Sequence, residues 1–336
     1  MAYKASAERY NEMQYNYCGK SGLRLPAVSL GFWHNFGSNA DPENMKAMCF
    51  KAFDLGITHF DLANNYGPEN GSAETNFGKI LHNEMNAYRD EMIISTKAGY
   101  NMWDGPYGDW GSRKYLMASL DQSLKRMNLD YVDIFYHHRM DPKTPLEETM
   151  GALADIVRSG KALYVGISNY DGPTLARAEE IMESLNCPFV INQNRYSILD
   201  RTIEINGLKK MAKRLRKGII AYSPLAQGML TDRYLNGIPT DSRIRTDGRF
   251  LHESDLTTER MEQIRQLNAM AGERGQTLAQ MALGWVLNDE NITSVLIGAS
   301  SPEQIEENVS VIHQPGFTEN ELAEINKISL GHIDEI

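Results

Sequence analysis

Cysteine is scarce in this sequence, and basic residues are fewer than acidic ones. The 336 residues contain three cysteines, Cys18, Cys49 and Cys187, and no C-x-x-C pair. Widely spaced single cysteines are typical of reduced thiols, so we expect a cytoplasmic protein. Lys and Arg number 34 against 44 Asp and Glu, which gives a net charge of −10. Nucleic acid and anionic membranes both attract a basic face, so we expect neither as a partner.

Three other patterns are missing. No apolar run reaches the ~20 residues of a membrane-spanning helix. The first expected strand leads into Gly31-Phe32-Trp33-His34, which is not the G-x-G-x-x-G turn of a doubly wound dinucleotide-binding sheet. The sequence has no cluster of metal ligands, so we expect no metal. His59 and Asp61 share a strand face, however, and a metal-dependent hydrolase remains an alternative because of this pair.

Short apolar segments alternate with amphipathic ones along the chain. The expected strands are Val28–Leu30, Thr58–Asp61, Met92–Thr96, Tyr131–Tyr136, Ala162–Ile167, Phe189–Ile191, Ile219–Tyr222 and Ser294–Ile297. The expected helices between and after them are Asp41–Leu55, Ser72–Leu81, Ser112–Met127, Pro145–Arg158, Pro173–Leu185, Leu208–Arg216 and Pro302–Val311. Since each parallel crossover requires a helix, eight such units favour an α/β fold, the (β/α)8 TIM barrel. A doubly wound open sheet is the alternative.

Two additions to this barrel are expected. Tyr15–Val28 reads as an N-terminal β-hairpin around the turn Gly19-Lys20-Ser21-Gly22. A long loop, Pro224–Leu256, and two extra helices, Thr257–Arg274 and Thr277–Leu287, follow the seventh strand. No linker divides the chain, so we expect residues 1–336 to form one domain.

Ionisable side chains stand where the second, third and fourth strands end. Asp61 closes the second strand and Lys97 the third, while His138 follows the fourth. Tyr66 lies in the loop after Asp61. Chemistry in parallel barrels is located at the C-terminal ends of the strands, and neighbouring strand ends converge on one pocket. We therefore predict a catalytic group of four: Asp61, Tyr66, Lys97 and His138.

The four residues are an acid and the groups that tune it. A phenol of ordinary pKa, about 10, gives up its proton reluctantly at neutral pH. We expect Lys97 to lower the pKa of Tyr66, while Asp61 keeps the buried ammonium charged and in place. His138 can donate a hydrogen bond to a carbonyl oxygen. This group supplies only protons, so another source of electrons is needed, which suggests a redox cofactor.

At this point the chain resembles the aldo-keto reductases over essentially its whole length. The motifs that carry the resemblance are Phe60-Asp61 with Tyr66-Gly67, Thr96-Lys97, Tyr131–Phe135 with His138, Val165–Tyr170, Ala221–Leu225 and Ile297–Ser300. Within the family, the chain is similar to bacterial reductases of glyceraldehyde 3-phosphate and methylglyoxal. That branch also resembles the β-subunits of voltage-gated potassium channels.

The resemblance implies an enzyme. It implies NADPH-dependent reduction of small aldehydes to alcohols by hydride transfer, with Tyr66 as the general acid. The channel subunits tend to carry Asn at the position of His138, so this histidine favours catalysis. An NADP(H)-binding regulatory subunit remains the alternative.

The resemblance also implies how NADP(H) lies across the barrel mouth. The nicotinamide would meet Trp33, Asp61 and the ring of Tyr222, with its carboxamide held by Ser168, Asn169 and Gln193. The pyrophosphate would pass Ser223, Pro224, Leu225 and Gln227, with Arg233 and Arg243 as charged clamps. The contacts to the 2′-phosphate and adenosine would come from the last strand end and helix: Gly298, Ser300, Gln304, Glu307 and Asn308.

The substrate side is expected to include the loop Gly99–Gly111, which holds aromatic residues between glycines and can wall a pocket. The residues expected to meet the substrate are Trp33, Tyr66, Trp103, Arg113, His138 and Arg139. Arg113 opens a helix whose N-terminus is suited to a substrate phosphate. The expected partners are a small carbonyl compound and, by resemblance, further copies of the chain in a homo-oligomer.

Overall fold

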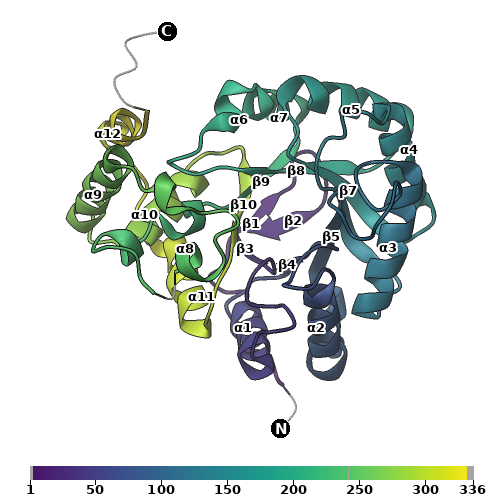
Figure 1. The fold of residues 1–336 in the computed structure, drawn as a ribbon, viewed down its shortest axis with the longest axis horizontal. Coiled ribbons are helices and arrows are strands. Elements are labelled where there is room, and N and C mark those ends of the chain that lie inside the picture. Colours follow the sequence, from purple (N-terminus) through teal and green to yellow (C-terminus); the bar gives the residue numbers. More distant parts are fainter. Residues whose placement is uncertain (1–2, 241, 331–336) are drawn as a thin grey trace.

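Eight parallel strands close into a barrel at the centre of the molecule (Figure 1). The computed structural model describes residues 3–240 and 242–330. Around the barrel the strands follow the order β10-β3-β4-β5-β6-β7-β8-β9. Their bounds are β3 (Val28–Gly31), β4 (His59–Asp61), β5 (Ile93–Ala98), β6 (Val132–His137), β7 (Ala162–Ser168), β8 (Phe189–Arg195), β9 (Gly218–Tyr222) and β10 (Ile292–Ile297). The predicted (β/α)8 barrel is confirmed.

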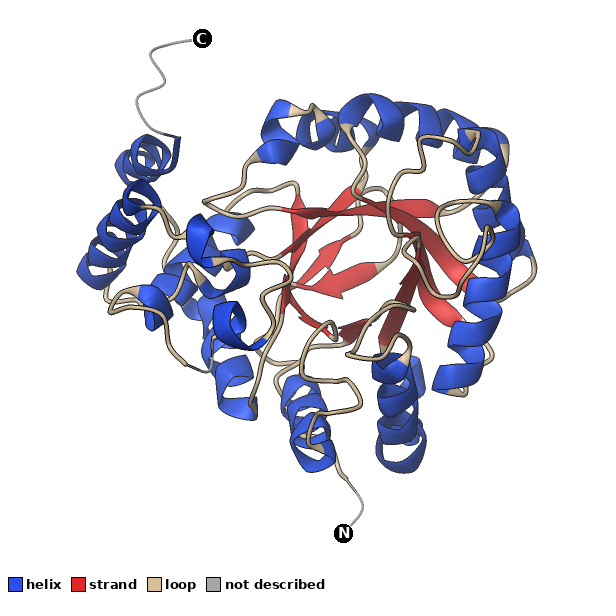
Figure 2. Cartoon of the chain, viewed as in Figure 1, coloured by secondary structure: helices blue, strands red, loops and turns tan. Residues whose placement is uncertain are grey.

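Helices surround the strands on the outside of the barrel (Figure 2). Those between the strands and after the last one are α1 (Pro42–Asp54), α2 (Ser72–Ile80), α3 (Arg113–Met127), α4 (Leu146–Arg158), α5 (Gly172–Ser184), α7 (Leu208–Leu215) and α11 (Pro302–Val309). The two extra helices predicted after the seventh strand are α9 (Thr258–Glu273) and α10 (Leu278–Leu287). None of the helices in the described ranges is long and apolar enough to cross a membrane.

Three α-helices within the described ranges were not predicted from the sequence. They are α6 (Thr202–Ile205), α8 (Arg243–Thr246) and α12 (Glu319–Leu330). The first two are single turns, too short to show a periodic apolar face. Helix α12 packs against α9 and buries only Ile325 and Ile328, so its apolar stripe is weak. The single-domain assignment of residues 1–336 stays a prediction, and residues 1–2, 241 and 331–336 lie outside the described residues.

Local capping explains why the predicted helices begin where they do. The Asp41 side chain accepts a hydrogen bond from the Glu43 amide, and Pro42 occupies the first turn of α1. The Ser112 hydroxyl accepts from the Tyr115 amide at the start of α3, at 3.2 Å. Helix α3 ends at Asn128, whose φ of 54° is left-handed. These caps fix the helices that carry and support the loops at the barrel mouth.

The N-terminal hairpin closes the end of the barrel where the strands begin. Its strands, β1 (Tyr15–Tyr17) and β2 (Arg24–Pro26), pair antiparallel, as predicted, and lead directly into β3. Leu23 and Leu25 belong to a cluster with buried side chains from four barrel strands, among them Ile134 and Ile220. Since the hairpin plugs this end, the open mouth lies at the C-terminal ends of the strands.

Candidate active site

Lys97 lies at the centre of the predicted catalytic group. Its Nζ donates to Asp61 Oδ2 at 2.5 Å, to the Leu62 carbonyl at 2.7 Å and to Tyr66 Oη at 3.2 Å. The side chain is fully buried, so these three bonds use all the protons of the ammonium. Residue 97 therefore links the end of β4 to the loop that carries the phenol.

Asp61 is the counter-charge of this lysine and is also fully buried. Its Oδ1 accepts from Ser95 Oγ at 2.6 Å and from Gln193 Nε2 at 3.1 Å. Ser95 is the register partner of Asp61 across β4 and β5, and Lys97 follows it by two positions on the same face. Three donors converge on the carboxylate, as a buried charge requires. The sequence did not single out Ser95, although its spacing from Lys97 places both on one face.

The pKa of Tyr66 corrects one expectation. Burial raises this pKa well above the ordinary value, and the Asp61 carboxylate raises it further. The lowering expected from Lys97 is outweighed by burial first and by the Asp61 carboxylate second. Burial also lowers the pKa of Lys97, against the opposing effect of Asp61. The Tyr66 hydroxyl therefore keeps its proton at neutral pH, which suits a group that donates one.

His138 follows β6 and joins the group beside Tyr66. The two ring centroids are 5.8 Å apart, and the Tyr100 ring meets the imidazole edge-on at 4.7 Å. Burial lowers the pKa of His138 well below its usual value, and the Lys97 charge adds to this effect. The imidazole is thus neutral and can donate one N–H. Its Nδ1 is buried without a hydrogen-bond partner in the described part of the chain.

The neighbouring His137 serves a different purpose. It is the last residue of β6, and its Nδ1 is 2.7 Å from Tyr170 Oη. This contact ties His137 to the segment that follows β7. The choice of His138 over its neighbour fits this arrangement.

The inner residues proposed for the cofactor are joined to the catalytic group. Tyr222 Oη donates to Asn169 Oδ1 at 2.8 Å, and Asn169 Nδ2 donates to the His138 carbonyl at 3.0 Å. Asn169 has a left-handed backbone with a φ of 59°. Ser168 lies next to it at the end of β7, and Gln193 contacts Asp61 from β8. These side chains form one connected rim around the phenol.

The outer residues lie on the loop after β9 and on the segment that folds over Trp33. Ser223 and Gln227 both have left-handed φ angles, a strained conformation that clusters at ligand sites. The Arg243 guanidinium lies 5.9 Å from the Trp33 ring centroid, and Phe250 packs edge-on to the same ring at 4.8 Å. Burial lowers the pKa of Arg243, and the positive charge of Arg233 adds to this effect.

The last cofactor corner is the start of α11. Gln304 Oε1 accepts from the Ser300 amide at 2.8 Å, which ties this helix to the loop after Gly298. Asn308 is buried, and its Nδ2 has no partner among the residues that the structure describes. Glu307 is exposed on the same helix.

These observations test whether the residues fit a dinucleotide. Asn308 Nδ2 is buried without a partner in the described part of the chain, and Arg243 places a guanidinium near Trp33. A phosphorylated, polar ligand would use both groups. The half-buried ring of Tyr222 stands at the end of β9, beside the catalytic group. The chain's residues therefore fit a nicotinamide dinucleotide along this rim.

Arg139 is held at the substrate side of the mouth. Its guanidinium lies between the rings of Trp110 and Tyr100, at 3.6 and 4.3 Å from their centroids. It also donates to Asp109 at 2.8 Å and to the Gly99 carbonyl at 2.7 Å. The aromatic loop is thereby pinned over His138. The sequence placed Arg139 at the rim but did not indicate these partners.

The two remaining substrate residues are placed differently. The Trp103 ring packs on Tyr115 at 5.2 Å, which holds it in the aromatic loop. Arg113 pairs with Asp155 of α4 at 2.6 Å and is half-exposed in the helical layer. The structure therefore does not bring the Arg113 guanidinium to the tetrad.

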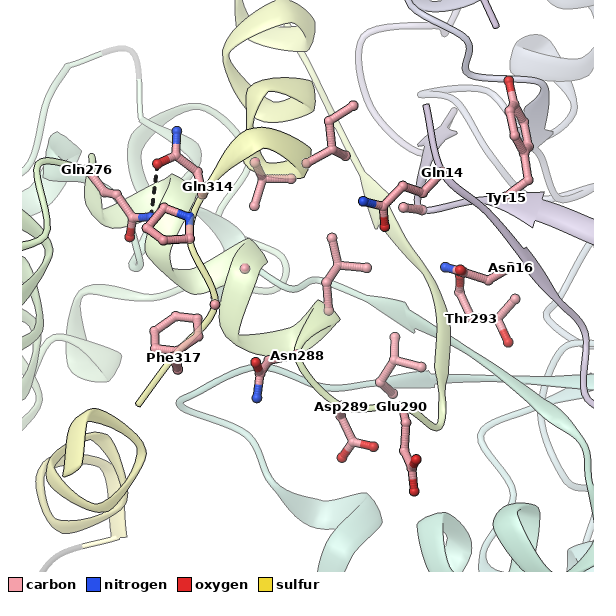
Figure 3. Close-up of a pocket in the computed structure, with 18 of the residues that line it drawn as sticks. Gln14, Tyr15, Asn16, Gln276, Asn288, Asp289, Glu290, Thr293, Gln314 and Phe317 are labelled. Atoms are coloured by element: carbon pink, nitrogen blue, oxygen red, sulfur yellow. Dashed lines mark hydrogen bonds between the residues drawn. The ribbon is translucent and has the colours of Figure 1, made fainter. Parts of the chain in front are cut away.

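A cleft lies at the opposite end of the barrel. This 490 Å³ cleft is lined by the hairpin, the end of α10 and residues 314–317, with side chains such as Asn16, Glu290 and Phe317 (Figure 3). A 250 Å³ pocket borders Asn169 at the mouth. The cleft beside the hairpin is the larger of these two cavities. The buried acid and its partners lie at the mouth, however, so we predict the chemistry there. Within the described ranges, no three His, Cys, Asp or Glu side chains are grouped to hold a metal ion.

Comparison with known proteins agrees with this geometry. The Aldo/keto reductase family matches residues 27–330. The chain is 57% identical over 330 residues to L-glyceraldehyde 3-phosphate reductase of Escherichia coli (strain K12), covering 97% of this chain and 95% of that protein. It is 36% identical over 305 residues to a putative voltage-gated potassium channel subunit beta of Schizosaccharomyces pombe, covering 89% and 88%. Because the family match spans the whole barrel, the chain belongs to the aldo/keto reductase family and is an oxidoreductase that uses a nicotinamide cofactor.

Proposed function

We propose that the chain is an NADPH-dependent reductase of small aldehydes, among them glyceraldehyde 3-phosphate and methylglyoxal. The observation that carries the proposal is the buried contact of 3.2 Å between Lys97 Nζ and Tyr66 Oη. The name of the 57% identical relative supports glyceraldehyde 3-phosphate as a substrate. A cytoplasmic homo-oligomer is the expected form of the enzyme, and light scattering of the purified chain tests the oligomeric state.

The chain's own residues would manage the proton. The chemistry that a bound nicotinamide supplies is a hydride for the carbonyl carbon. Tyr66 gives its phenolic proton to the carbonyl oxygen, so the aldehyde gains one hydride and one proton and becomes an alcohol. The Lys97 ammonium stabilises the phenolate as it forms, and neutral His138 donates to the same oxygen before transfer. The site thus stabilises negative charge only where it develops.

The residues of the rim would hold the dinucleotide. Ser168, Asn169 and Gln193 present amide and hydroxyl groups for a carboxamide, and Tyr222 offers a ring face. Arg233 and Arg243 supply positive charge for phosphates, and Ser300 and Gln304 lie at the N-terminus of α11, where a 2′-phosphate is favoured. This corner supports the proposed preference for NADPH over NADH.

The relatives named as potassium channel subunits motivate a second candidate function. The chain is 34% identical over 305 residues to a probable voltage-gated potassium channel subunit beta of Arabidopsis thaliana, covering 89% of this chain and 91% of that protein. A regulatory subunit would bind NADP(H) tightly and turn over slowly. The neutral His138 beside Tyr66 favours an enzyme over a regulatory subunit.

A panel of aldehydes assayed with NADPH and with NADH separates these candidates. We expect multiple turnovers with glyceraldehyde 3-phosphate and methylglyoxal, and a higher kcat/KM with NADPH. Tight NADPH binding without multiple turnovers would instead support the regulatory subunit. Activity that depends on a metal and not on NADPH would support the hydrolase.

A further inference from the structure

A line of buried polar side chains runs from Asp61 into the interior of the barrel. Beyond Ser95 it continues through His59 Nε2 at 2.9 Å, from His59 Nδ1 to Ser29 Oγ at 2.9 Å, and from there to Ser294 Oγ at 2.6 Å. The three serines and the histidine are all fully buried. They come from four adjacent strands of the eight in the barrel, β10, β3, β4 and β5, and all four side chains are shielded from solvent.

The direction of each hydrogen bond in this line can be worked out from Asp61. A carboxylate oxygen only accepts, so Ser95 must give its one proton to Asp61. Ser95 then has only lone pairs to offer His59, and His59 Nε2 must carry a proton. Burial lowers the pKa of His59 to about 4, opposed by Asp61 and reinforced by Lys97, so the imidazole is neutral near pH 7. A neutral ring with a protonated Nε2 accepts at Nδ1, and Ser29 is its donor.

We infer that His59 is a positioning residue for the reaction: it fixes the Ser95 hydroxyl as a permanent donor to Asp61 and thereby holds Lys97 against Tyr66. The inference deepens the proposed function and rests on it. If His59 Nε2 were an acceptor instead, the Ser95 hydroxyl would have two acceptors beside it. It could then turn its proton from Asp61 to the ring. The donor at His59 Nε2 removes that freedom by occupying the lone pair of Ser95.

This role differs from the metal site that His59 and Asp61 suggest in the sequence. Both ring nitrogens of His59 contact serine hydroxyls, which leaves neither nitrogen for a metal ion. Ser29 and Ser294 act further back, since they secure the tautomer of His59. Their influence on Asp61 should therefore be smaller than that of Ser95.

The first test reads the tautomer directly and needs no catalysis. Nitrogen-15 NMR of the full chain at pH 7, with His59 identified among the eight histidines by comparison with His59→Gln, should show a protonated Nε2 and an unprotonated Nδ1. The opposite tautomer, or a charged ring, would overturn the inference whether or not the chain reduces aldehydes.

The second test is a double-mutant cycle on kcat. His59→Leu and Ser95→Ala should each lower kcat by about ten- to a hundredfold, the range for one hydrogen bond to a charged group. If His59 acts through Ser95, the double variant should be no worse than the more damaged single variant, whereas multiplied effects would overturn the inference. His59→Gln, which keeps a donor near the Nε2 position, should recover part of the activity.

Two further variants keep this test decisive. Ser123→Ala removes a buried serine of α3 outside the line and should leave kcat unchanged. Should His59→Leu not fold, Ser29→Ala takes its place in the cycle, since it removes the donor to Nδ1 and leaves the imidazole present. Additivity of Ser29→Ala with Ser95→Ala would contradict the inference equally.

Discussion

Lys97 Nζ lies 3.2 Å from Tyr66 Oη and 2.5 Å from Asp61 Oδ2. The ammonium therefore contacts both the proposed acid, Tyr66, and its own counter-charge, Asp61. All three groups are buried, so the ammonium and the carboxylate compensate each other's charge away from water. The phenol keeps its proton until an acceptor arrives, and the ammonium stabilises what remains afterwards. The predictions below test separate parts of this arrangement.

Removing the ammonium should damage stability as well as activity. Lys97→Met leaves the Asp61 carboxylate buried without its counter-charge, so we expect the free energy of unfolding to fall by about 3–5 kcal/mol. Urea denaturation followed by circular dichroism measures this change. In the matched control, Asp61→Asn combined with Lys97→Met should regain much of the stability but none of the activity. An unchanged unfolding midpoint for the single variant would argue against a buried ion pair.

Acidification should destabilise the fold through its buried histidines. Burial lowers the pKa of both His59 and His137 from 6.5 to about 4. Between these values the unfolded chain binds protons that the fold does not, so stability is full above pH 6.5 and falls as the pH drops toward 4. Each histidine should contribute about 1.4 kcal/mol per pH unit in this window. Urea denaturation at pH 7, 6 and 5 measures the slope, and His59→Gln should make it shallower.

Arg139 should govern substrate binding through the aromatic loop. Arg139→Ala removes the cation between Trp110 and Tyr100, and we expect KM for glyceraldehyde 3-phosphate to rise roughly tenfold as the loop loosens. Arg139→Lys should not restore it, because an ammonium lacks the flat face that stacks between two rings. As a matched control, Arg113→Ala should leave kcat/KM unchanged, since Arg113 pairs with Asp155. A lower kcat/KM for Arg113→Ala would indicate that Arg113 contributes to substrate binding after all.

Arg243 should contribute to cofactor affinity. Its half-buried guanidinium lies near the Trp33 ring, where it can hold an anion. We expect Arg243→Met to weaken NADPH binding by about ten- to a hundredfold, as for one lost hydrogen bond to a charged group. Tryptophan fluorescence titration of the purified chain measures the Kd. NADH should be weakened to a similar degree if the contact is to the pyrophosphate, and an unchanged Kd would place the phosphates elsewhere.

The architecture was predictable because its signals are local. The caps at Asp41 and Ser112 and the apolar runs that end at Asp61 and Lys97 follow from neighbouring residues alone. In a parallel barrel, strand ends converge whatever the detailed packing, so the grouping of the tetrad could be expected. Helix α12 escaped prediction because few of its residues are buried.

The balance of forces at the site was not predictable in the same way. The direction of the pKa shift of Tyr66 depends on how completely burial removes water and how far Asp61 offsets Lys97, and only coordinates fix both. Ser95, Asp109 and Trp110 act through contacts between residues distant in the chain, which no local pattern encodes. The sequence left His59 as a possible metal ligand. Its hydrogen-bond partners, Ser29 and Ser95, come from two other strands and could not be read from the neighbouring residues.

The identity of the acid is the centre of this account, and single-turnover reduction tests it most directly. Chain preloaded with NADPH is mixed with methylglyoxal, and the loss of nicotinamide absorbance is followed for the native chain and for Tyr66→Phe. We predict that the variant reacts about a hundred- to ten-thousandfold more slowly, the usual contribution of a general acid, while its Kd for NADPH is unchanged. A Tyr66→Phe chain that oxidises NADPH at the native rate would contradict the assignment.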